Sequence, residues 1–321
     1  MRPWVKPDKK ELELAKDGQP YLLLFPNTLS MQQFEIIFQS SPELLIFLIF
    51  IIGLLVGSFL NVVIYRLPVM MNSGWKKECT EYLGLEETES NKAPFNLMVP
   101  LSRCPDCCTA IKPYQNIPVI SYLLLRGKCS QCKSHIALRY PLIEAFTGIA
   151  SAIVAFQFSY SLELLFALFL TWSLIALSFI DIDHQLLPDS ITLPVLWLGL
   201  FLSLFAIYTD THSSIIGAIA GYLSLWTVYQ LFKLATGKEG MGYGDFKLLA
   251  LFGAWLGWQY IPLIILLSSL VGAVIGISMI LLSKKDKNTP IPFGPYLAAA
   301  GWLALLWGDE INRLYLNTLG L

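Results

Sequence analysis

Long apolar runs constrain this sequence more than any other feature. Eight of them alternate with polar connections, at 44–65, 142–158, 162–180, 191–208, 213–234, 246–258, 262–282 and 291–307. A helix needs about 20 apolar residues to cross the hydrocarbon core of a bilayer, and a spanning segment must satisfy its own backbone hydrogen bonds, which favours helices. With 55% hydrophobic and 14% charged residues, the composition excludes an ordinary soluble domain. The sequence therefore predicts an all-α polytopic membrane protein with about eight transmembrane helices.

The polar segments define the expected domain organisation. Residues 1–43 are a polar extension, and its short apolar stretch at 21–25 is not expected to act as a cleavable signal peptide. Residues 44–65 are the first transmembrane helix, and residues 66–141 form a soluble domain that contains all six cysteines. Residues 142–310 are expected to form a seven-helix membrane domain, followed by a tail at 311–321.

The distribution of positive charge predicts the orientation in the membrane. Alternate crossing places residues 66–141, 181–189, 235–247 and 283–290 on one side. With Lys233 at the end of the preceding run, this side carries sixteen of the 22 Lys and Arg residues. Positively charged loops stay preferentially in the cytoplasm, so this side is predicted to be cytoplasmic. Asp181 and Asp245 then lie at the same membrane face, at the ends of different helices.

These two aspartates are the candidate catalytic groups. Asp245 follows three glycines in the stretch Gly240-Met-Gly-Tyr-Gly-Asp245. A carboxylate at the edge of a membrane span is costly to desolvate, so it indicates a functional site. Two carboxyl groups held close together share a proton, and such a pair can activate water and protonate a leaving amine. The alternative is that Asp245 only caps a helix beginning at Phe246.

Three residues near Asp181 are rivals or accessories. Asp189 follows Pro188 and precedes an apolar run, which favours an N-cap role. Asp183 would point away from Asp181 if the helix continues. His184 shares the helical face of Asp181 and either orients the carboxylate or lies among lipid headgroups.

The cysteines predict a metal centre. Cys104-Pro-Asp-Cys107 and Cys129-Ser-Gln-Cys132 are two C-x2-C pairs separated by 21 residues, a pattern typical of a closed, structural tetrahedral zinc site. Two disulfides and an iron centre are the alternatives, and a reducing cytosolic face disfavours the disulfides. Cys79 and Cys108 are expected to be free thiols.

The first apolar run and the residue that follows it carry three further features. Gly53 and Gly57 have the GxxxG spacing that permits close helix packing. Asn61 is expected to form an interhelical hydrogen bond. Arg66 is interpreted as an anchor whose charged end reaches the membrane surface.

Several motifs in fixed order resemble one family. They are the segments 57–68, 116–122, 125–129, 139–144, 181–189, 242–245 and 292–295, together with the two C-x2-C pairs. In these the chain resembles the bifunctional type IV prepilin peptidases, aspartic membrane enzymes of the GxGD class. The resemblance covers most of the chain from about residue 44 to residue 307.

The resemblance implies two activities, of which the second, methyl transfer, could not have been inferred from the residues alone. Members of this family cut the basic leader from type IV prepilins or type II secretion pseudopilins at the cytoplasmic face of the inner membrane. They then methylate the new N-terminal amine with S-adenosylmethionine. Matched motif by motif, Asp181 and Asp245 would be catalytic, and Cys104, Cys107, Cys129 and Cys132 would bind zinc. Gly127 matches a position linked with methyl transfer; the alternative is a turn glycine.

Other classes of function remain as alternatives. One is a peptidase without methyltransferase activity, and another is a transporter that uses the two aspartates to bind a cation or relay protons. A zinc-bearing membrane scaffold would explain the cysteines but not the glycine-rich segment before Asp245. Nucleic acid is not an expected partner, because membrane topology already accounts for the basic residues.

Overall fold

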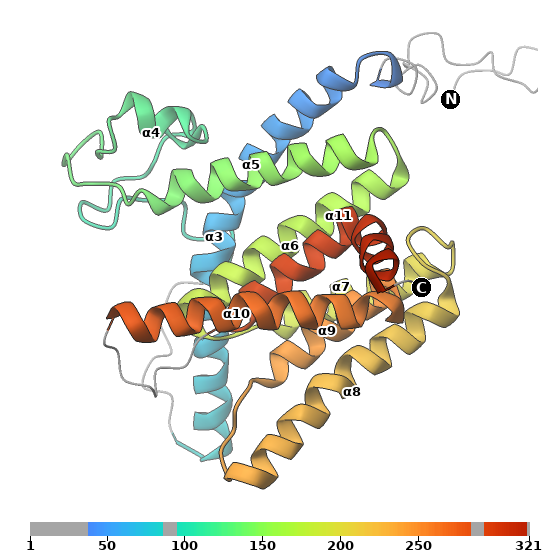
Figure 1. Ribbon diagram of the computed structural model, residues 1–321. Helices are drawn as coiled ribbons and strands as arrows, with labels where there is room; N and C mark the ends of the chain where they lie inside the picture. The colour runs from blue at the N-terminus through green and yellow to red at the C-terminus, as the bar shows by residue number, and fades with distance from the viewer. Residues whose placement is uncertain (1–37, 86–94, 284–291, 320–321) are drawn as a thin grey trace, which may run out of the picture. The chain divides into compact units, whose positions relative to one another are not determined.

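The computed structural model describes residues 38–85, 95–283 and 292–319. Its long helices are α3 (Pro42–Tyr82), α5 (Arg139–Phe158), α6 (Leu162–His184), α7 (Asp189–Ser203), α8 (Thr211–Thr236), α9 (Tyr243–Leu256), α10 (Ile261–Ser283) and α11 (Gly294–Leu319) (Figure 1). Each predicted apolar run coincides with one helix, and the described residues contain no β-strand. The all-α class is therefore confirmed. The chain divides into two compact units, Met1–Ser41 and Pro42–Leu321, and these helices belong to the second.

Four predicted regions lie wholly or partly outside the described residues. They are most of the polar extension, residues 86–94 of the domain predicted at 66–141, the basic connection at 283–290 and the end of the tail.

Five segments are long and apolar enough to cross a membrane: Pro42–Tyr82, Arg139–Phe158, Leu162–His184, Thr211–Thr236 and Trp258–Ser278. A multi-pass membrane protein is thus supported, but the structure gives five candidate spans among the described residues rather than eight. Helix α7 has 15 residues and α9 has 14, both below the usual length of about 20 residues. Helix α11 is long enough but is kinked at Trp307, where the backbone leaves helical geometry.

Helix α9 is surrounded by protein. Every residue from Phe246 to Leu256 except Lys247 is buried. Its closest neighbour is α8, where Gly217 faces Gly253 and Gly221 faces Leu249 so tightly that a Cβ on any of the three glycines would lie within 3 Å of backbone atoms. The indole N–H of Trp255 also donates to the carbonyl oxygen of Val195 in α7, at 2.8 Å. The core of the second unit is therefore built around α9.

Helices α3 and α5 form the other close pair. A Cβ on Gly53 would meet Ser151, and one on Gly57 would meet Glu144 and Thr147, all at 3.1 Å or less. The side-chain amide of Asn61 donates to the carbonyl oxygen of Tyr140 at 3.2 Å. The packing role of the two glycines and the interhelical role of Asn61 are both confirmed.

The first helix was expected to end at Tyr65, but α3 continues to Tyr82. Hydropathy marks where a helix leaves the bilayer, whereas a helix ends only where its backbone pattern is broken. Pro68 lies inside α3 without ending it, and the chain turns only at Gly84, whose φ is +63°. Glycine adopts this left-handed conformation without strain.

Arg66 is not the surface anchor that was expected. Its side chain is buried, and its guanidinium donates to the carbonyl oxygens of Asn96 at 2.9 Å and Pro100 at 2.5 Å. It also lies over the ring of Phe95. Because a guanidinium offers five N–H donors in a planar fork, one residue of α3 holds the start of residues 95–138. This segment contains the two C-x2-C pairs and is called the cysteine domain below.

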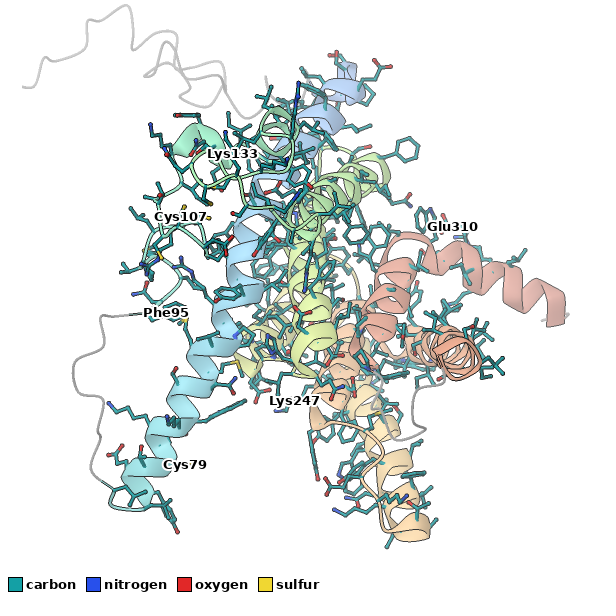
Figure 2. All side chains as sticks on the ribbon, turned by 90° about the vertical axis from the view of Figure 1, so that its left-hand side faces the viewer. Cys79, Phe95, Cys107, Lys133, Lys247 and Glu310 are labelled. Carbon is teal, nitrogen blue, oxygen red and sulfur yellow. The ribbon has the colours of Figure 1, made fainter. Side chains whose placement is uncertain are left out.

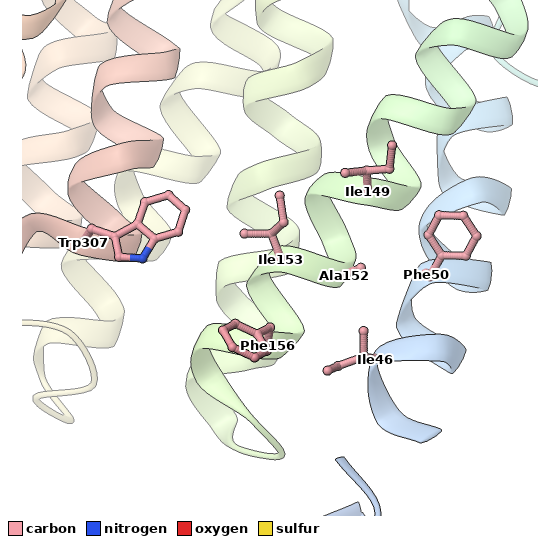
Figure 3. A pocket seen from close by; sticks show the side chains of 7 residues that line it. All are labelled: Ile46, Phe50, Ile149, Ala152, Ile153, Phe156 and Trp307. Atoms are coloured by element: carbon pink, nitrogen blue, oxygen red, sulfur yellow. The ribbon is translucent and has the colours of Figure 1, made fainter. Parts of the chain in front are cut away.

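An open apolar hollow of about 450 Å³ lies between α3, α5 and the kink of α11 (Figure 3). It is lined by Ile46, Phe50, Ile149, Ala152, Ile153, Phe156 and Trp307. These side chains offer no carboxyl, imidazole or thiol group, so this hollow is not a candidate site for hydrolysis.

The α8–α9 contact yields a stability prediction. Gly253→Ala would place a Cβ 2.0 Å from the carbonyl oxygen of Gly217, so we expect a loss of about 1–3 kcal/mol, the usual cost of overpacking a core. The measurement is thermal unfolding in detergent. Gly74→Ala is the matched control, because no atom lies within 4 Å of its added Cβ and alanine favours helix over glycine. Equal unfolding midpoints for the two variants would contradict this packing.

Candidate active site and metal centre

Asp181 lies in the last turn of α6, and its residue is only 5% exposed. Its Oδ2 accepts a hydrogen bond of 3.0 Å from the backbone N–H of Gly294, the first residue of α11. A Cβ at position 294 would lie 2.7 Å from that oxygen. Glycine is therefore needed here for close approach, and α11 supplies a fixed donor to the carboxylate.

Asp245 is the third residue of α9 and is 8% exposed. The helix begins at Tyr243 with Gly242 as its N-cap residue, so the interpretation of Asp245 as the cap of a helix starting at Phe246 is wrong. A carboxylate in the first turn of a helix is stabilised by the helix dipole. Asp245 also lies close enough to Asp181 to interact with it electrostatically.

Leu187 brings the three segments around this pair together. It lies in the turn after α6, and a Cβ on Gly244 would be 2.8 Å from the Cβ of Leu187. A Cβ on Gly294 would be 3.2 Å from its Cδ2. The glycine before Asp245 and the glycine beside Asp181 thus both contact one apolar side chain, which explains why neither position accommodates a larger residue.

Asp183 is held in an ion pair away from the aspartate pair. Its two carboxylate oxygens accept hydrogen bonds of 2.7 and 2.5 Å from the guanidinium of Arg139, at the start of α5. The same guanidinium lies 5.4 Å from the centroid of the Phe179 ring. Because α6 continues through His184, Asp183 points elsewhere than Asp181, as predicted.

Asp189 is the first residue of α7, with Pro188 as the N-cap residue, so the predicted N-cap role is wrong. Its carboxylate instead accepts two hydrogen bonds of 2.7 Å from the ammonium group of Lys247, two residues after Asp245. This pair joins the N-terminal ends of α7 and α9. His184, the other neighbour of Asp181, is exposed.

The four cysteines of the C-x2-C pairs converge as predicted. Their sulfur atoms all lie within 4.8 Å of one another. The Cys104–Cys132 and Cys107–Cys129 distances are 3.7 and 4.0 Å. A disulfide requires about 2.0 Å, whereas a tetrahedron with Zn–S bonds of 2.3 Å has edges of about 3.8 Å. The arrangement fits a metal ion and not two disulfides.

The two C-x2-C turns have the same backbone pattern. The N–H of Cys104 donates to Thr109 and that of Cys129 to Ser134, while the fifth residue of each turn, Cys108 or Lys133, donates back to the first cysteine. Cys108 and Lys133 both have φ near +60°. Cys108 therefore occupies the position of a lysine in the other turn, and it is not among the four converging thiols.

Backbone N–H groups prepare one thiol to bind a cation. Hydrogen bonds from the backbone of Cys107 and Asp106 lower the pKa of the Cys104 thiol to about 6. A thiolate, not a thiol, is the metal ligand. Cys79 is exposed at the far end of α3, and Figure 2 shows it well separated from Cys107.

Gly127 has the conformation of a turn glycine. Its φ is +66°, and a Cβ would lie 2.8 Å from the hydroxyl of Tyr122. It follows α4 (Ile120–Leu124) in the cysteine domain. In Figure 2 this domain, marked by Cys107 and Lys133, is well separated from Lys247, which lies two residues after Asp245.

Some residues of the site were missed by sequence reasoning. Gly294 lies in the Pro292-Phe-Gly-Pro295 segment that contributes to the family resemblance, but no physical role had been assigned to it. Lys247 was counted only as a positive charge, and Arg139 only as a positive charge and as part of the 139–144 motif. The sequence held one signal for these ion pairs: Asp181 and Asp245 are each followed two residues later by a charged residue, Asp183 and Lys247.

Comparison with known proteins identifies the family. Residues 51–158 match the bacterial peptidase A24 N-terminal domain, and residues 168–277 match the type IV leader peptidase family. No solved structure matches.

Curated relatives agree over most of their length. Proteins named prepilin leader peptidase/N-methyltransferase from Stutzerimonas stutzeri and Pseudomonas aeruginosa are each 56% identical, covering 87% and 88% of this chain and 96% and 97% of their own lengths. One from Legionella pneumophila is 44% identical over 86% of this chain and 96% of its own. The chain belongs to the type IV prepilin leader peptidase/N-methyltransferase family.

Proposed function

We propose that this protein is an aspartic endopeptidase that removes the basic leader of type IV prepilins or type II secretion pseudopilins and then methylates the new N-terminus. The observation that carries the proposal is the pair of buried carboxylates, Asp181 and Asp245, supplied by two helices. The nearby carboxylates of Asp183 and Asp189 form ion pairs with the side chains of Arg139 and Lys247, respectively. Only Asp181 and Asp245 are therefore proposed as the general acid and base.

The hydrogen bond from Gly294 favours a division of roles. A backbone N–H aimed at a carboxylate oxygen stabilises its ionised form, and Oδ2 of Asp181 receives such a bond. Asp181 is accordingly proposed as the base that takes a proton from water, and Asp245 as the group that carries the shared proton. Asp245 then hydrogen-bonds the scissile carbonyl oxygen, and the proton transferred to the pair passes to the leaving amine.

Methyl transfer is proposed from the names of the relatives. S-adenosylmethionine would supply an electrophilic methyl group to the new amine. The N–C bond would form as the S–CH3 bond breaks, leaving S-adenosylhomocysteine, and the amine nitrogen would lose one proton to water. Gly127 is retained as a candidate for this second activity. Its conformation equally fits a turn that shapes the cysteine domain, so only its effect on methylation separates the two roles.

The cysteine cluster is proposed to hold one structural zinc ion through Cys104, Cys107, Cys129 and Cys132. Four thiolates leave no open coordination position for a substrate or water. The ion would stabilise a domain that has very few buried side chains. The proposed location is the inner membrane, with this domain and the aspartates on the cytoplasmic side, because that side carries most of the Lys and Arg residues.

The combined activity is tested on the protein in lipid nanodiscs with a cognate prepilin and S-adenosylmethionine. Mass spectrometry is expected to show loss of the leader and gain of one methyl group. Asp181→Asn and Asp245→Asn should each lower the cleavage rate about 10²–10⁴-fold, the contribution of a positioned acid or base. Asp183→Asn and Asp189→Asn are matched controls and should cost less than about tenfold, since exposed ion pairs contribute at most about 1 kcal/mol.

Substantial cleavage by either asparagine variant at position 181 or 245 would overturn the catalytic assignment. A product that lacks the leader but gains no methyl group would contradict the proposed methyltransferase activity.

Gly294→Ala tests the donor to Asp181. The added Cβ would displace the carboxylate, so we expect kcat to fall about 10–100-fold with little change in KM, as for small misplacements of catalytic groups. Gly272→Ala in α10 is the control, because the nearest atom to its Cβ is 3.4 Å away. An unchanged kcat in Gly294→Ala would show that this contact does not position Asp181.

Metal analysis tests the cysteine cluster. The purified protein is expected to contain one zinc ion per chain, and Cys129→Ser should lose it because one of the four ligands is gone. Cys79→Ala and Cys108→Ala should keep the full metal content. Retention of zinc by Cys129→Ser, or its loss from Cys108→Ala, would contradict the ligand set.

A further inference from the structure

The apolar side chains of helix α4 are exposed on the surface of the cysteine domain. None of its five residues is buried. Ile120, Leu123 and Leu124 are 55%, 66% and 79% exposed, and their spacing places them on one face of the helix. The half-buried side faces the domain, where Tyr122 contacts Gly127. In a soluble domain a contiguous apolar face of this kind marks an interaction surface.

The start of α4 is fixed to a candidate membrane helix. Val119, the N-cap residue of α4, donates its backbone N–H to Oε2 of Glu144 at 2.8 Å. Glu144 lies in α5, five residues after the first residue of this candidate span. Helix α4 therefore begins beside the end of a helix that is apolar enough to enter a bilayer.

The charge of the domain is complementary to an anionic surface. Residues 95–138 contain five Lys and Arg residues and one acidic residue, Asp106. Arg126 and Lys128 follow α4 directly and are exposed. Apolar residues flanked by basic ones are typical of a segment that lies in a membrane interface with anionic lipids.

We propose that α4 lies in the lipid interface beside α5, with Ile120, Leu123 and Leu124 among the acyl chains and Arg126 and Lys128 at anionic headgroups. The cysteine domain then rests on the bilayer instead of extending freely into the cytoplasm. This contact would add a lipid attachment to the two protein attachments already described, the Val119–Glu144 hydrogen bond and the hydrogen bonds from Arg66. The inference does not depend on the proposed enzymatic activity.

Photo-crosslinking of the full-length protein in nanodiscs that contain phosphatidylglycerol tests the contact. Benzoylphenylalanine replaces Leu124 in one preparation and Leu101, which is 78% exposed in the same domain, in the matched control. Mass spectrometry of the irradiated protein is expected to show a lipid adduct at position 124 in several-fold excess over position 101. Equal yields at the two positions, or none at 124, would overturn the proposal.

A second measurement separates a lipid surface from a protein partner. Each of the changes Arg126→Ala and Lys128→Ala should lower the ratio of docked to free α4 about fivefold, the value of one positive charge near an anionic surface. The readouts are the adduct yield at position 124 and the hydrogen exchange of amides 120–125. An adduct that forms only with added prepilin, and never with lipid, would assign this face to the substrate instead.

Discussion

Burial of two carboxyl groups is the constraint on which the rest of this structure depends. A carboxylate removed from water costs several kcal/mol unless a partner compensates for it. Asp181 is compensated by a backbone donor from α11, and Asp245 by its place in the first turn of α9. Both solutions require helix ends to meet at one point. The glycines at 244 and 294 and the side chain of Leu187 make that meeting sterically feasible.

The sequence predicted the helices better than their relation to the membrane. Among the described residues hydropathy located all eight long helices, including the short run at 246–258. It did not reveal that α9 is enclosed by protein, because a helix buried in protein and a helix in lipid are equally apolar. The roles predicted for Arg66 as a surface anchor and for Asp189 as an N-cap residue were also wrong. Each of these charged residues contacts a segment distant in sequence, and composition near a helix end gives no information about such partners.

The residues of the candidate site likewise divide into those that the sequence predicted and those that it did not. Asp181, Asp245 and the four cysteines were recognisable, because their chemistry requires particular residue types at particular spacings. Gly294 was not given a role, since it acts through a backbone N–H that any residue but proline possesses. What distinguishes it is the lack of a Cβ, and that becomes meaningful only when the nearby carboxylate is placed.

The contact between Asp181 and Gly294 joins residues 113 positions apart. A ribosome adds residues to a growing chain one after another, so α6 is made well before the segment that supplies the donor. A partly synthesised chain accordingly has the carboxylate of α6 without its partner. The proposed hydrolytic centre therefore receives the donor to Asp181 only when α11, the last long helix of the described residues, has been added.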